Sequence, residues 1–128
     1  MVSMFHQYAP RTLLRIRRAL RRLCRDADAR VAVVRGHGRV IEHDGDEQAL
    51  PTRFPVLHTS VGCVHRAQCR DGESVVASAR VRFMRGWPPL EIFVVGPHVE
   101  NPEVFAALDA AVEAIEDAVF AKNARLAG

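Results

Sequence analysis

Residues 11–25 read RTLLRIRRALRRLCR and carry the clearest periodic pattern in the chain. Apolar side chains recur along this stretch at intervals of three and four residues, which predicts a helix with one buried face. Pro10 stands where a helix can begin, because its missing N–H has no helical partner at that position. Most of the other positions are arginine, so the stretch predicts an outward face crowded with guanidinium groups.

Two short runs rich in β-branched residues follow this helix, at 30–35 and 39–43. The link Gly36-His37-Gly38 predicts a hairpin between them, because glycine adopts a positive φ at little cost. The next segment, 44–55, is polar and contains two prolines, so we expect a loop that holds at most one short helical turn.

The second half of the chain predicts more antiparallel strands and a closing helix. Asp71-Gly72 separates the runs 61–69 and 74–85, and this dipeptide favours a tight hairpin. A last, mostly apolar strand is expected at 90–95. Asn101-Pro102 predicts the start of a helix that runs to about residue 124, with Asn101 as its cap.

These elements predict one α+β domain that comprises residues 1–128. We expect an antiparallel sheet of four to five strands, arranged as a meander, with the N-terminal and C-terminal helices packed on one of its faces. A chain of 128 residues has the size of a single domain. Its content of 48% hydrophobic and 26% charged residues excludes a disordered chain.

The sequence also predicts a cytoplasmic protein with no membrane span. Its longest apolar stretches have four or five residues, whereas a spanning helix needs about 20. The first ten residues lack the basic segment and apolar run of a secretory signal.

Positive charge is concentrated at the start of the chain. Residues 1–30 contain eight arginines and two aspartates, a net charge of +6, whereas the remaining residues contain ten cations and thirteen acids. Of the 18 basic residues only Lys122 is a lysine. Because the planar guanidinium group donates several hydrogen bonds to one phosphate, this bias favours a phosphate-rich partner.

The outward arginines predict a nucleic-acid interface. Clustered cations bind phosphodiester backbones by releasing condensed counterions, and a helix holds them in a row. Two further arginines lie two residues apart on a predicted strand, so they point the same way and extend the surface. The residues predicted to contact phosphates are Arg11, Arg15, Arg18, Arg22, Arg25, Arg80 and Arg82. Two alternatives stay open: pairing with the acids of the last helix, and contact with an anionic membrane surface.

Metal binding and catalysis are not expected. His58, Cys63, His65 and Cys69 have metal-ligating side chains but lack a Cys-x-x-Cys pair, and ligands along one strand diverge by about 7 Å for every two residues. No nucleophile stands beside a base, and no phosphate-binding loop is present. We therefore predict a non-enzymatic protein without cofactor, metal or catalytic residues.

The C-terminal part, from Ala79 to Leu126, resembles a known family. The residues that carry this resemblance are the strand 79–83 (ARVRF), the turn 86–89 (GWPP), the strand 90–95 and the segment 104–112 (VFAALDAAV). In these it is similar to the ribosome hibernation-promoting factors, which are small ribosome-associated inhibitors of translation. The resemblance covers under half of the chain. It implies one strand, a helix, three strands and a closing helix, and binding to ribosomal RNA.

The order of predicted elements is also similar to that of roadblock or profilin-like sensor modules. There a helix precedes a hairpin, and three antiparallel strands and a final helix follow a connection. This resemblance implies a protein-interaction or sensor module that forms a homodimer or docks its basic helix on an acidic partner. The acids expected on the outer face of the last helix suit it: Asp109, Glu113, Glu116 and Asp117. The leading hypothesis from the sequence is a non-enzymatic binder of ribosomal or other structured RNA, and the interaction module is the alternative.

Overall fold

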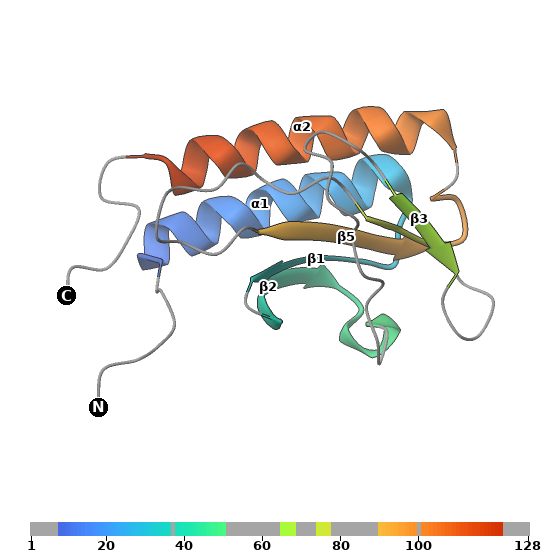
Figure 1. Cartoon of the computed structure of the whole chain (residues 1–128), viewed down its shortest axis with the longest axis horizontal. Helices are drawn as coiled ribbons and strands as arrows, with labels where there is room; N and C mark the ends of the chain where they lie inside the picture. The colour runs from blue at the N-terminus through green and yellow to red at the C-terminus, as the bar shows by residue number, and fades with distance from the viewer. Residues whose placement is uncertain are drawn as a thin grey trace.

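Two long helices lie side by side on one face of an antiparallel sheet (Figure 1). The computed structural model describes residues 8–36, 38–50, 65–68, 74–77, 90–99 and 101–121, of which 65–68 and 74–77 are described by their backbone alone. Within these residues, the α+β class and the packing of both helices on one face are confirmed.

The elements follow the order expected from the sequence. They are α1 (Pro10–Ala27), β1 (Val31–Gly36), β2 (Arg39–Gly45), the 3-10 turn η1 (Glu47–Ala49), β3 (His65–Gln68), β4 (Ser74–Ala77), β5 (Glu91–Gly96) and α2 (Pro102–Val119). The strands of both predicted hairpins pair in antiparallel fashion, β1 with β2 and β3 with β4, whereas His37 and the Asp71-Gly72 turn lie outside the described residues. The predicted short helical turn is η1, although β2 extends through Gly45 into the segment expected to be a loop.

The strand order is not the expected meander. The sheet runs β2-β1-β5-β4-β3, so the first strand pairs with the last, and β2 and β3 form opposite edges. The physical reason is the composition of β1 and β5, which read VAVVRG and EIFVVG. Strands that are apolar at successive positions need cover on both faces, and only the middle of the sheet provides it.

The β1–β5 pair divides its side chains between two cores. Toward the helices it presents Ala32, Val34, Ile92 and Val94, and toward the opposite face Val31, Val33, Phe93 and Val95. On the opposite face Ala49 and Leu50, at the end of η1, pack against this second cluster.

One face of α1 is buried against the sheet and α2, as its periodicity predicts. Ile16 and Leu20 are fully buried and Leu23 nearly so. Burying an aliphatic side chain of this kind stabilises the fold by about 1.5–3 kcal/mol. The helix begins with Pro10 and extends two residues beyond the predicted end at residue 25.

The end of α1 positions the helix tightly on the sheet. Asp28 adopts a left-handed conformation with φ of 49°. The Asp28 N–H donates to the carbonyl of Arg25 at 3.3 Å, and the Ala29 N–H donates to that of Cys24 at 2.9 Å. These two hydrogen bonds form a Schellman motif, in which aspartate replaces the usual glycine. The Arg30 N–H then donates to the carbonyl of Val95 at 2.8 Å, so the sheet begins two residues after the turn.

A β-bulge shifts the pairing register between β1 and β2. Val34 lies opposite Glu42, but Arg35 lies opposite Val40, which leaves Ile41 as an extra residue on β2. A bulge of this kind directs two successive side chains to similar sides of the strand. Ile41 consequently packs against the helix-side core, and Glu42 also approaches α1.

The second helix, α2, buries a stripe that matches the expected one. Val104, Leu108, Ile115 and Val119 are buried, whereas Val112 is half-buried. Asn101 occupies the cap position, but its side chain accepts no capping hydrogen bond, contrary to expectation. The helix also ends at Val119, before the predicted residue 124.

We expect truncation of Leu20 to destabilise the fold strongly. Leu20→Ala leaves a cavity between α1 and the sheet and should lower the free energy of unfolding in urea by about 2–5 kcal/mol. Leu14 provides a matched control, because it lies on the same helix and its side chain is 49% exposed. Leu14→Ala should change the unfolding free energy by less than about 0.5 kcal/mol. Equal losses in the two variants would contradict this assignment of the core.

Candidate functional site

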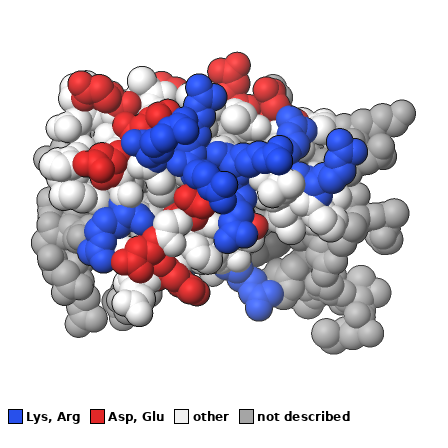
Figure 2. Space-filling model, turned by 180° about the vertical axis from the view of Figure 1, so that it is seen from behind, with Lys and Arg blue, Asp and Glu red and all other residues white. Residues whose placement is uncertain are grey.

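The exposed face of α1 is the main candidate site. Five exposed arginines follow each other at intervals of four and three residues and form one row opposite the buried stripe. This outer arginine row consists of Arg11, Arg15, Arg18, Arg22 and Arg25. Figure 2 shows basic side chains forming a continuous band across this side of the molecule, with acidic side chains along its border. The helical part of the predicted phosphate-contacting set is therefore brought together on one surface.

Among the described residues, the outer row has few internal partners. Arg22 and Arg25 approach Asp26 at 3.8 and 3.5 Å, and all three side chains are well exposed. Exposed ion pairs of this kind contribute at most about 1 kcal/mol each. Arg11, Arg15 and Arg18 form no ion pair or hydrogen bond with any residue in the described part of the chain. Within the described residues, their exposed guanidinium groups are thus unpaired.

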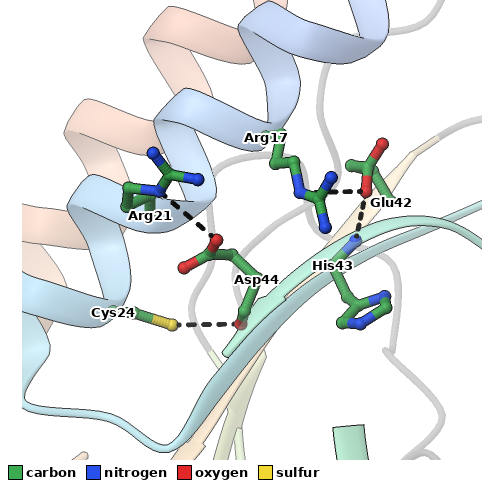
Figure 3. A network of polar contacts seen from close by, with 6 residues as sticks. All are labelled: Arg17, Arg21, Cys24, Glu42, His43 and Asp44. Carbon is green, nitrogen blue, oxygen red and sulfur yellow. Dashed lines mark hydrogen bonds and ion pairs between the residues drawn. The ribbon is translucent and has the colours of Figure 1, made fainter. Parts of the chain in front are cut away.

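Two other arginines of α1 are engaged by β2 (Figure 3). The Arg17 Nε atom lies 3.7 Å from Glu42 Oε1, and Arg21 Nε lies 3.5 Å from Asp44 Oδ1. Both carboxylates are mostly buried, whereas both arginines are at least half exposed. These contacts connect the side of α1 to the edge strand and separate Arg17 and Arg21 from the outer row.

Sequence reasoning did not identify these two pairs, although the chain carries a signal for them. Arg17 and Arg21 are four residues apart and lie on one side of a helix, and Glu42 and Asp44 are two apart and lie on one side of a strand. Matching the two spacings predicts the pairing once β2 is known to lie beside α1.

Cys24 lies next to this network, and its thiol has low reactivity. Its Sγ–H donates to the carbonyl oxygen of Asp44 at 3.3 Å. Burial, together with the negative charge of Asp44, raises the pKa of the Cys24 thiol to about 11. Because the thiolate is the nucleophilic form, Cys24 is unreactive near neutral pH.

The beginning of β1 carries a further ion pair, between Arg30 and Asp46. Arg30 Nη2 donates to Asp46 Oδ2 at 3.0 Å, and the Gln48 N–H donates to Asp46 Oδ1 at 3.0 Å. The hydrogen bond from Arg30 is the main reason that the pKa of Asp46 is lowered. Asp46 thereby caps η1, the turn that covers the second core.

The exposed side of α2 complements the outer arginine row in charge. Its outer row, again at intervals of three and four residues, consists of Glu103, Ala106, Ala110, Glu113 and Asp117, all of which are exposed. Asp109 is exposed beside this row. Across the described part of the chain, no arginine of α1 forms an ion pair with an acid of α2. The alternative that the arginines pair with the last helix of the same chain is therefore not observed there.

The remaining residues singled out in the sequence lie largely outside the described part of the chain. This holds for the predicted phosphate-contacting Arg80 and Arg82 and for three residues with metal-ligating side chains, His58, Cys63 and Cys69. The fourth such residue, His65, is described in β3 by its backbone alone. The described residues contain no group of three or more side chains suited to holding a metal ion. Neither described helix has the length and apolar character needed to cross a membrane.

Comparison with known proteins shows a likeness to a solved structure. No protein-family model and no curated protein matches the chain. Among solved structures it is similar to the gliding protein MglB from Thermus thermophilus, with a TM-score of 0.61. The fold is shared. The likeness covers 92% of this chain and 97% of MglB, at 14% sequence identity.

The environment of Cys24 predicts a pH profile. In a Cys63→Ser/Cys69→Ser protein, the alkylation rate of Cys24 by iodoacetamide should rise with a midpoint near pH 11 in the folded state. The midpoint should return toward the ordinary 9.0 in urea. Because the folded pKa is the higher one, the contribution of Cys24 to stability is complete below about pH 9 and is lost as the pH rises toward 11. The same midpoint in folded and unfolded protein would contradict the assigned environment.

Proposed function

We propose that this protein is a non-enzymatic protein-interaction module of the roadblock or profilin-like type, which acts as a homodimer. The observation that carries the proposal is the arrangement of its elements. A helix, a hairpin, a connection, three antiparallel strands and a final helix were expected for such modules, and the described chain has this order.

The number of strands distinguishes the two resemblances. Five described strands lie between α1 and α2, as a hairpin and three further strands require. The resemblance to hibernation-promoting factors implies three strands between its helices. The likeness to MglB also favours the interaction module over a hibernation-promoting factor. It covers nearly the whole of both chains, whereas the resemblance to hibernation-promoting factors covers under half of this chain.

The polar groups beside the hairpin support a structural role rather than catalysis. Glu42 and Asp44 face Arg17 and Arg21, and Glu42 Oε1 also accepts a hydrogen bond from its neighbour's backbone, the His43 N–H, at 3.2 Å. Carboxylates held in this way position the edge strand on α1. We therefore assign no catalytic role to these carboxylates.

The proposed homodimer predicts a defined sedimentation behaviour. Sedimentation velocity at low ionic strength should show one reversible monomer–dimer equilibrium that shifts toward the dimer as protein concentration rises. Urea-unfolded protein serves as the monomer reference. A folded protein that sediments as a monomer at every concentration would contradict the homodimer.

RNA binding is a second candidate, and a specific observation favours it. Arg11, Arg15 and Arg18 lack partners in the described chain, so a phosphate backbone could bind them without breaking internal ion pairs. If the five arginines of the outer row neutralise five phosphates, binding to structured RNA should weaken steeply with salt.

The salt dependence provides a quantitative test of this candidate. The logarithm of the RNA-binding constant should fall against the logarithm of salt concentration with a slope of about −3.5 to −4.5, from a coefficient of about 0.7 per phosphate in single strands and 0.9 in duplex. Arg15→Glu/Arg18→Glu should abolish the binding, whereas Arg17→Ala should change it little because Arg17 is engaged by Glu42. Binding that ignores salt, or survives the double reversal, would eliminate RNA as the partner.

A further inference from the structure

Two ion pairs within the chain show how α1 accommodates an acidic strand (Figure 3). Arg17 Nε lies 3.7 Å from Glu42 Oε1. Four residues further along the helix, Arg21 Nε lies 3.5 Å from Asp44 Oδ1, which is two residues further along β2. The strand therefore runs in the same direction as the helix and presents alternate carboxylates to arginines four residues apart.

The two pairs fit because helix and strand have similar repeats at this spacing. Four residues of an α-helix advance by about 6.0 Å, and two residues of a β-strand advance by about 6.8 Å. The flexible arginine side chain takes up the small difference between these two lengths. An extended segment with acids at alternate positions is therefore the kind of chain that fits arginines at an interval of four.

The outer arginine row repeats this spacing. Arg11 and Arg15 are four residues apart. The same interval separates Arg18 from Arg22. The whole row extends about 21 Å, which is the length of about seven residues of extended chain. Among the described residues, only the exposed Asp26 pairs with this row. The row can thus accept an extended segment with about four carboxylates on its helix-facing side.

We propose that the outer arginine row binds an extended acidic segment of a partner protein, in which glutamate or aspartate occupies alternate positions. The inference rests on the proposed function as a protein-interaction module and identifies the chemistry of a partner. The segment lies along α1 as β2 does, and runs parallel to it. Its acidic side chains face the arginines, and the side chains between them face away from the helix.

The charges beside the row favour a narrow partner. Figure 2 shows acidic side chains along the border of the basic band. The neighbouring helix α2 contains no basic residue and carries four exposed acids, which are Glu103, Asp109, Glu113 and Asp117. Packed helices have axes about 8–10 Å apart, close to the Debye length of about 8 Å at physiological ionic strength. A duplex or a bilayer is wider than one helix, so part of its negative charge approaches these acids and is repelled. A single extended chain contacts the arginine row alone.

The composition of α1 also favours carboxylates over nucleobases. Its 18 residues include no aromatic side chain on which a base could stack. The guanidinium groups of its arginines are planar and match a carboxylate in bidentate fashion. The helix can therefore recognise negative charge on a peptide without the stacking contacts that hold a single-stranded nucleic acid.

Two labelled peptides of equal composition and charge test the proposed spacing. In one peptide of eight residues threonine and glutamate alternate, and in the other the same residues form two blocks of four. Fluorescence anisotropy at low ionic strength should show at least about threefold tighter binding of the alternating peptide, because its carboxylates match the arginine interval and threonine favours an extended chain. Charge density alone would favour the block peptide.

Arginine variants test the proposed surface. Arg15→Gln/Arg18→Gln removes one arginine from each pair and should raise the dissociation constant of the alternating peptide by about fivefold or more. The matched control is Arg30→Gln/Arg39→Gln, which has the same composition and net charge but changes exposed arginines outside α1. It should alter this constant by less than about twofold. Circular dichroism verifies that both variants are folded.

Removing acids from α2 tests the argument from width. In Glu113→Gln/Asp117→Gln, binding of duplex RNA and of phosphatidylserine vesicles should strengthen more than binding of the alternating peptide, because only the wider partners approach α2 closely. An equal gain for all three ligands would contradict a partner confined to the arginine row.

The outcomes separate this contact from the function on which it rests. Equal binding of the two peptides, no binding of either, or binding that survives Arg15→Gln/Arg18→Gln would overturn the contact and leave the homodimer untouched. A protein that is monomeric at every concentration but binds the alternating peptide through the row would refute the homodimer and support the contact. If duplex RNA or phosphatidylserine vesicles displace the alternating peptide at an equal concentration of negative charge, the row belongs to that polyanion and the acidic segment is wrong.

Discussion

Burial of the β1–β5 pair on both of its faces is the constraint on which the rest of the structure depends. Two strands with unbroken apolar runs cannot leave either face in water, so the sheet needs a layer on each side. The helices supply one layer, and η1 contributes to the other. Because α1 directs Ile16, Leu20 and Leu23 inward, the arginines on the other side of the helix point outward. The exposed arginine row is thus a geometric consequence of the core.

The edge strand then decides which arginines remain available. The extra residue at Ile41 turns Glu42 toward α1, and Asp44 follows on the same side two residues later. Arg17 and Arg21 form ion pairs with these half-buried carboxylates, although they lie only one residue from Arg18 and Arg22. Gly45, with φ of 106°, ends this strand where a Cβ atom would collide with the carbonyl oxygen of Arg30. Local backbone geometry in β2 therefore shapes the charge pattern of a neighbouring helix.

The sequence was sufficient to locate the helices and strands but not to predict which of them pack or pair with one another. Periodicity located α1, the hairpin partners and the inner stripe of α2, because these properties depend on residues close together in the chain. It could not show that β1 pairs with β5, since 60 residues separate Val31 from Glu91 and a strand pattern does not specify its partner. The bulge at Ile41 could not be predicted either, because a run of β-branched residues has the same sequence pattern with or without an extra residue. In the site, the helical wheel predicted the outer row, but the division between paired and available arginines required the position of β2. Arg80 and Arg82 remain predictions.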